Sequence, residues 1–197
     1  MSGERLEQFK NKLEDLKGHF HFAVSWDEAV ALSLEICQDA GGSQMAVART
    51  PVQFRAALEV KCQEAGLKLS GPPFASETLP GAIDAVDVGI TGIDFGIART
   101  GTLVEVSTDD ATRLVSALPR THIGLLSERE LVAELDDAAP RLREAFTKHP
   151  KNCVVSFLSG PSRTGDIEMR LTLGVHGPES AHVIVMAETL EMEVTSG

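Results

Sequence analysis

The sequence predicts one α/β domain, built on a mostly parallel β-sheet that is flanked by helices. Over residues 25–69 the order is helix, strand, helix, strand with short connections, which is typical of parallel sheets. Residues 153–158 form a short apolar run rich in β-branched residues, which indicates a buried strand. A length of 197 residues, 43% of them hydrophobic, is enough for one sizeable core.

The N-terminal part is expected to stand somewhat apart. Apolar residues recur at helical spacing over residues 4–18, with Lys and Glu between them, which predicts an amphipathic helix. We expect residues 1–24 to form a helical appendage that ends in a short strand and docks on the domain or on a partner. The α/β domain is expected over residues 25–190, followed by a tail at 191–197.

Capping boxes, proline positions and apolar periodicity indicate the remaining elements. Thr100, Gly101 and Thr102 lie between two apolar runs and indicate a hairpin turn or a bulge. Residues 71–86 are expected to be a loop with one helical turn. Helices are expected at residues 25–40, 50–66, 109–117, 127–135, 141–149 and 167–173, and strands at 44–48, 67–69, 123–126, 153–158 and 181–186.

Charge and motifs exclude several classes of function. A formal net charge of -11 argues against general binding to nucleic acid or to anionic membranes. Cys37, Cys62 and Cys153 lack C-x-x-C spacing, so we expect neither a metal nor any other cofactor in this chain. Rossmann and P-loop glycine motifs are absent. The charged N-terminus and the lack of a long apolar stretch predict a cytoplasmic protein without membrane insertion.

A polar cluster at residues 159–168, with its sequel at 174–178, is the strongest candidate site. It follows strand 153–158, and open α/β sheets bind ligands beyond the carboxyl ends of their strands. A helix beginning near Arg163 would add its positive end, and small residues would let backbone N–H groups face an anion. The alternative is a strand–helix connection in which Ser, Thr and Asp only cap the helix.

The chemistry expected of these residues is anion binding and proton transfer. Arginine offers a planar fork for carboxylate or phosphate, and histidine can move a proton near neutral pH. The candidate catalytic residues are His176, His122, Asp166 and Glu168. For His122 a hydrogen-bonded structural histidine at a strand edge is the favoured alternative. The candidate ligand-binding residues are Ser159, Gly160, Ser162, Arg163, Thr164, Arg99, Thr100, Gly101 and Thr102.

Three segments resemble the LUD-domain family, in particular its lactate utilization protein C branch. They are residues 159–168 with 173–178, residues 91–102 and residues 118–123, so that the resemblance covers roughly residues 85–187. Two positions depart from the family pattern, because Arg99 stands where Glu is usual and Gly165 where Ala is usual.

The resemblance implies a fold similar to ribose-5-phosphate isomerase, glucosamine-6-phosphate deaminase and CoA transferases. It also implies the non-iron–sulfur subunit of a system that oxidises L-lactate to pyruvate, with iron–sulfur clusters on partner subunits. The ligand would be a small carboxylate or a phosphorylated compound. An alternative is a stand-alone enzyme or binding module for a phosphorylated sugar or acyl-CoA, since fold does not fix function.

Overall fold

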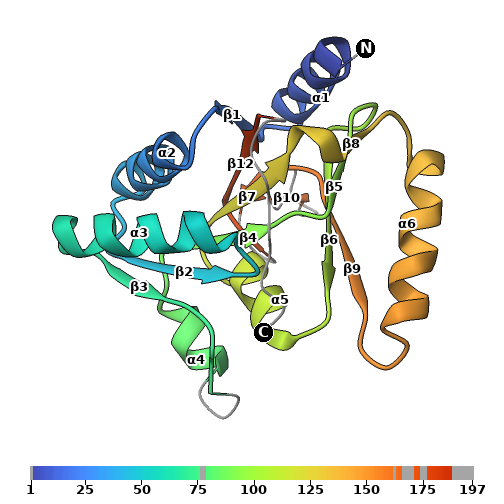
Figure 1. The fold of residues 1–197 in the computed structure, drawn as a ribbon. Helices are drawn as coiled ribbons and strands as arrows, with labels where there is room; N and C mark the ends of the chain where they lie inside the picture. The colour runs from blue at the N-terminus through green and yellow to red at the C-terminus, as the bar shows by residue number, and fades with distance from the viewer. Residues whose placement is uncertain (1, 76–78, 162, 166–170, 174–176, 188–197) are drawn as a thin grey trace.

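A six-stranded sheet forms the centre of the protein (Figure 1). In a computed structural model, residues 2–75, 79–161, 163–165, 171–173 and 177–187 are described. Every neighbouring pair of strands in this sheet is parallel. The strand order is β1 (His19–Ala23), β12 (Ser180–Met186), β7 (Thr121–Ser127), β4 (Val88–Gly92), β2 (Gln44–Ala48) and β3 (Lys68–Ser70).

A second, smaller sheet lies beside the first. Its strand order is β8 (Leu131–Val132), β5 (Phe95–Ile97), β6 (Thr102–Ser107) and β9 (Val154–Leu158). β5 and β6 form the antiparallel hairpin expected around Gly101, and β9 is antiparallel to β6. A separate two-stranded pair joins β10 (Arg163–Gly165) to β11 (Leu171–Leu173).

Helices cover both faces of the large sheet, as the α/β prediction requires. One face packs against α2 (Trp26–Asp39) and α3 (Val52–Ala65), and the other against α1 (Ser2–Asp15) and α5 (Asp110–Ala117). The short α4 (Leu79–Asp84) lies next to α5. α6 (Leu135–Lys148) covers the outer face of the small sheet (Figure 1).

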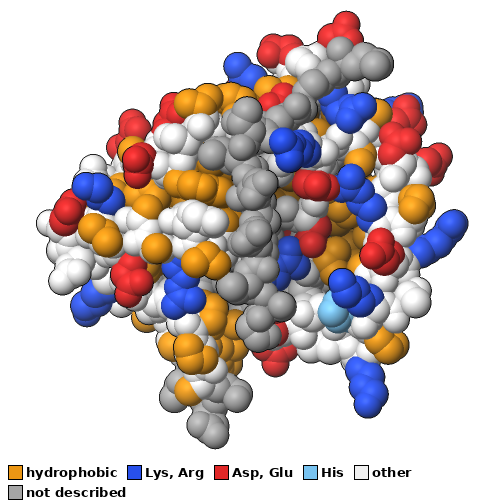
Figure 2. Space-filling model, in the orientation of Figure 1, with side chains coloured by type: hydrophobic (Ala, Val, Ile, Leu, Met, Phe, Trp, Pro, Cys, Tyr) orange, Lys and Arg blue, Asp and Glu red, His pale blue; other side chains and the backbone are white. Residues whose placement is uncertain are grey.

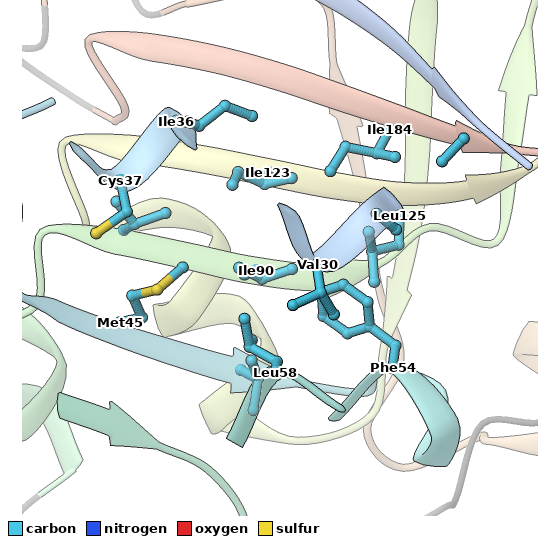
Figure 3. Close-up of a cluster of buried hydrophobic side chains, with 14 of the residues drawn as sticks. Val30, Ile36, Cys37, Met45, Phe54, Leu58, Ile90, Ile123, Leu125 and Ile184 are labelled. Carbon is cyan, nitrogen blue, oxygen red and sulfur yellow. The ribbon is translucent and has the colours of Figure 1, made fainter. Parts of the chain in front are cut away.

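The main core lies between the sheet and the α2–α3 pair (Figure 3). Val30 of α2 and Phe54 and Leu58 of α3 pack on Ile90 and Ile123 of the sheet, and all five are almost fully buried. The central strands β4 and β7 are buried along their whole length, since both of their faces are covered.

The N-terminal residues form a second core cluster on the other face of the large sheet. Phe9 and Leu13 of α1 pack with Val183 and Val185 of β12, and Phe9 is fully buried. β1 extends the large sheet by pairing with β12. α1 therefore docks on the domain.

Three helices expected from the sequence are wrong in the part that the structure describes: those at 127–135, at 167–173 and beginning near Arg163. Residues 128–132 form a 3-10 turn (Glu128–Glu130) and then β8, because β8 finds its backbone partners in β5, far away in sequence. α6 begins earlier than the expected start at Pro140, with Glu134 and Asp137 forming its capping box. β11 replaces the end of the helix expected at 167–173, and β10 replaces the helix expected to begin near Arg163.

Candidate functional site

Successive strands are added to the large sheet in one direction from β2 and in the opposite direction from β4. The chain leaves β2 through α3 on one face and returns as β3, whereas it leaves β4 toward the small sheet and α5 on the opposite face. Diverging connections leave a crevice at the carboxyl ends of such a strand pair, and ligands of open α/β sheets bind there.

A cavity of about 840 Å³ opens at this point, between the end of β2, the start of α3 and the start of α5. Three arginines line it, and we call it the arginine cavity. Two aspartates, Asp109 and Asp110, also lie in its wall. The lining residues are Ala48, Arg49, Thr50, Arg55, Pro72, Pro73, Phe74, Leu79, Pro80, Asp109, Asp110, Ala111, Thr112, Arg113 and Leu114.

Arg49 follows β2 directly and is held firmly. Its backbone lies in the left-handed region, with φ of 53°, which costs about 1–2 kcal/mol for a residue with a side chain. Its guanidinium donates to Asp94 Oδ2 at 2.8 Å and to the backbone oxygens of Val106 and Gly92. Asp94 Oδ2 also accepts from the Val106 N–H at 2.6 Å. Arg49 thus links the two sheets through hydrogen bonds. Its guanidinium has a fixed position in the cavity wall, and Asp94 largely balances its charge.

The other two arginines differ in their partners. Arg113 of α5 pairs with Asp110 and donates to Asn152 Oδ1 at 3.2 Å. Arg55 of α3 donates to the Pro72 backbone oxygen at 2.8 Å. Among the residues that the structure describes, no carboxylate pairs with Arg55.

A buried polar cluster connects the two sheets with α5. Glu105 of β6 is fully buried. Its Oε2 accepts from Thr91 Oγ1 of β4 at 2.7 Å, and its Oε1 lies 3.0 Å from Ser116 Oγ of α5. Thr91 Oγ1 also lies 2.9 Å from His122 Nε2. Because the Thr91 hydrogen goes to Glu105, His122 is the donor of that contact and carries its hydrogen on Nε2.

Burial sets the protonation states in this cluster. It raises the pKa of Glu105, against the opposing effects of the Thr91 and Ser116 hydroxyls and of the Arg49 charge. It also lowers the pKa of His122 to about 4, so this histidine is neutral at physiological pH. The Ser116 hydroxyl donates to Glu105 Oε1, and it also lies 3.1 Å from the Arg113 backbone oxygen.

The site predicted from the sequence lies elsewhere, and two of its residues are in contact. Thr102 Oγ1 of β6 and Ser159 Oγ, just after β9, are 2.8 Å apart. Arg99 is 66% exposed and pairs with Glu134 at 2.8 Å. His122 lies in the buried cluster of the large sheet and not beside these residues. We call residues 99–102 together with Ser159 and Gly160 the motif region.

The glycines of the motif region pack against α1. A side chain on Gly101, where φ is 63°, would collide with the backbone of Lys12 and Leu13. One on Gly160, where φ is 91°, would collide with the Leu16 backbone oxygen. Close contact with α1 thus accounts for both glycines. β9 lies in the small sheet, so the expectation that this loop follows a strand of the parallel sheet is wrong.

Several predicted site residues fall outside the described part of the chain. They are Ser162, Asp166, Glu168 and His176. For Arg163 and Thr164 only the backbone is described, as part of β10. Thr100 is an exposed residue of the β5–β6 turn.

Sequence reasoning missed the arginine cavity. Its best signal is Arg49-Thr50-Pro51, which follows the apolar strand at 44–48 and so marks a strand's carboxyl end. Arg55, Phe74 and Arg113 carry no motif, because only the fold brings them to one place.

Neither a metal cluster nor a membrane span is found in the described residues. No group of three or more His, Cys, Asp or Glu there is arranged to hold a metal ion. In the same residues, no helix combines the length and apolar character needed to cross a bilayer. Cys37, Cys62 and Cys153 are free thiols, and burial raises the pKa of Cys37 to about 11.

Comparison with known proteins decides the family. The LUD domain model matches residues 6–186. The chain belongs to the LUD-domain family. The resemblance seen in the sequence is therefore confirmed, and the LUD domain takes in α1 and all strands of the large sheet.

Curated relatives match about half of this LUD-domain chain. Lactate utilization protein C of Anoxybacillus flavithermus is 37% identical over 107 residues, which cover 54% of this chain and 47% of that protein. Lactate utilization protein C of Shouchella clausii is 40% identical over 103 residues, covering 52% and 45%. The chain thus spans about half the length of the curated relatives it matches.

A solved structure supports the fold. The crystal structure of a DUF162 family protein from Deinococcus radiodurans superposes with a TM-score of 0.63 at 20% identity. The match covers 94% of this chain and 98% of that one. The α/β fold predicted from the sequence is confirmed.

Proposed function

We propose that this chain takes part in lactate utilization and binds an anionic ligand in the arginine cavity. Membership of the LUD-domain family and the relatives named lactate utilization protein C support the first statement. The observation that carries the second is the set of three partly buried arginines at the carboxyl ends of β2 and β4. Guanidinium groups in a partly dry cavity attract carboxylates and phosphates strongly.

The proposed role is that of a subunit that binds and positions, while partner subunits carry electrons. Oxidation of L-lactate to pyruvate releases electrons, and the three cysteines of this chain lie far apart in the sequence. We propose that iron–sulfur partner subunits accept these electrons. In Figure 2, acidic and basic side chains are interspersed over the visible face, which suits a protein partner better than a polyanion.

A gene deletion tests the role. A strain that lacks this chain should grow poorly on L-lactate as sole carbon source and normally on glucose. The wild-type gene should restore growth, whereas Arg55→Ala should not. Arg120→Ala is the matched control, because Arg120 is 78% exposed and pairs with Glu179 outside the cavity. Normal growth of the deletion strain on L-lactate would refute the role.

A pulldown tests the partners separately. The chain, tagged and purified from cells grown on L-lactate, should bring down proteins that contain iron–sulfur clusters, detected by their iron content and visible absorbance. If the chain is recovered alone from cells with a functional lactate pathway, the proposed partners are refuted. The proposed role in lactate utilization is not refuted by that result.

The cavity favours one second candidate function. Its volume of about 840 Å³ lies in the range of roughly 300–1,000 Å³ that holds drug-sized ligands, which is far more than a three-carbon acid fills. The chain could thus serve on its own as an enzyme or binding module for a phosphorylated sugar or acyl-CoA. Normal growth on L-lactate without the gene would favour this function.

A further inference from the structure

We propose that the ligand of the arginine cavity is a phosphate ester with a largely apolar or aromatic body. This inference deepens the proposed function, on which it rests for the location of the anion site. It follows from three features of the cavity: one arginine without a carboxylate partner, an uncapped helix start and an apolar wall.

The first feature is the charge of Arg55. Arg49 and Arg113 each face a carboxylate, Asp94 and Asp110 respectively. Arg55 is partly buried and bonds only to a backbone oxygen among the described residues. That oxygen fixes the guanidinium at the cavity wall without neutralising it. Arg55 is therefore the group whose charge an incoming anion would balance.

The second feature is the start of α3. Its N-cap is Pro51, whose side chain has no oxygen to accept from the first N–H groups of the helix. Thr50, immediately before it, lines the cavity, as does Arg55 in the first turns of α3. The positive end of a helix of 14 residues therefore lies beside Arg55. α5 starts at the same cavity, but the Asp109 side chain already caps it.

The third feature is an apolar wall of the cavity. Pro72, Pro73, Phe74, Leu79 and Pro80 give this part of the lining its apolar character. Phe74 is itself partly buried against the cluster around Ile83 and Val115, so its position is fixed by packing. Such a wall removes apolar ligand surface from water and offers an aromatic ring for stacking.

These features together select the ligand class. Phosphate suits both a guanidinium fork and a helix N-terminus, and it can bear more charge than a carboxylate. The apolar wall and the volume require an organic body larger than that of lactate. A phosphate ester with an aromatic or apolar body meets both conditions, whereas lactate meets only the first.

Calorimetric titration with graded probes tests this class. The probes are adenosine 5′-monophosphate, glucose 6-phosphate, inorganic phosphate, adenosine and L-lactate. We expect adenosine 5′-monophosphate to bind at least tenfold more tightly than inorganic phosphate, adenosine or L-lactate. Glucose 6-phosphate, whose body is polar, should lie between the monophosphate and inorganic phosphate.

Variants locate the binding. Arg55→Ala should weaken the binding of adenosine 5′-monophosphate at least tenfold, and Arg55→Lys should restore part of it. Phe74→Ala should weaken adenosine 5′-monophosphate but leave inorganic phosphate unchanged. Arg120→Ala should change neither. Circular dichroism and urea unfolding check that each variant folds. If Arg55→Ala does not fold, Arg55→Lys and Phe74→Ala still decide the test.

The outcomes separate this inference from the proposed function. Tighter binding of L-lactate than of any phosphate ester, abolished by Arg55→Ala, would overturn the ligand class and leave the lactate role intact. Equal loss in Arg55→Ala and Arg120→Ala would overturn the cavity as the site. The monophosphate could bind tightly while deletion of the gene leaves growth on L-lactate normal. That pair of results would support the ligand class and refute the role in lactate utilization.

Discussion

The arginine cavity and the motif region hold their arginines in opposite ways. In the cavity, Arg49 has 20% of its side chain exposed and bonds to Asp94 and two backbone oxygens. In the motif region, Arg99 has 66% exposed and makes one surface ion pair with Glu134. A surface pair of this kind contributes about 0–1 kcal/mol and is screened by salt. Fixed, partly buried charge therefore lies at the strand ends and not in the motif.

The two regions also use small residues differently. Gly101 and Gly160 leave room for the backbone of α1, so the motif region joins the N-terminal helix to the small sheet. The cavity instead combines helix starts and prolines around open space. A glycine-rich motif can thus mark a packing contact, while the ligand site that we propose has no motif at all.

The largest effect that would sharpen this comparison is expected from Gly101→Ala. The added methyl group collides with the α1 backbone at a positive φ, so we expect a loss of about 2–4 kcal/mol in the free energy of unfolding. Urea denaturation measures it. The control is Gly81→Ala in α4, where nothing lies within 4 Å of the new atom. A loss below about 0.5 kcal/mol for Gly101→Ala would contradict the packing role.

The next effect concerns the buried cluster beside the cavity. The pKa of His122 is lowered from 6.5 to about 4 by burial, so the unfolded chain binds this proton more readily than the folded one. The contribution of neutral His122 to the free energy of unfolding is fully present above pH 6.5 and is lost as the pH falls toward about 4.

His122→Gln, which keeps a donor for Thr91 but does not titrate, removes this dependence. Urea unfolding from pH 7.5 to pH 4 should show that the wild type loses up to about 3 kcal/mol more than the variant. The same pH slope in both proteins would show that His122 is not the group responsible.

A smaller effect tests whether the motif region binds the ligand. Thr102→Val removes the contact with Ser159 and should cost about 1 kcal/mol of unfolding free energy. The affinity for adenosine 5′-monophosphate should not change, since neither residue lines the arginine cavity. A tenfold loss of affinity would instead assign the ligand to the motif region and reverse the comparison.

The smallest effect is a gain in stability. Lys17 follows α1 with φ of 68°, a conformation that glycine adopts without strain. Lys17→Gly should raise the free energy of unfolding by roughly 0.5–1 kcal/mol. Thermal unfolding at two protein concentrations measures it. A destabilised variant would mean that the Lys17 side chain contributes more than its backbone strain costs.

The sequence by itself determined the family, the α/β class and most elements. α2, α3, α5 and the strands β2, β3, β7 and β12 lie within a few residues of their expected bounds, since their signals are local. Capping residues, glycines and apolar runs act over one turn or one strand. The hairpin at Gly101 was predicted for the same reason.

Only the tertiary structure decided β8, the β10–β11 pair and the arginine cavity. β8 forms because β5 offers it backbone partners, and no local signal carries that information. Arg49, Arg55, Phe74 and Arg113 come from four separate segments and meet where the strand order reverses. A cavity depends on distances between segments remote in sequence, whereas the sequence records directly only the order along the chain.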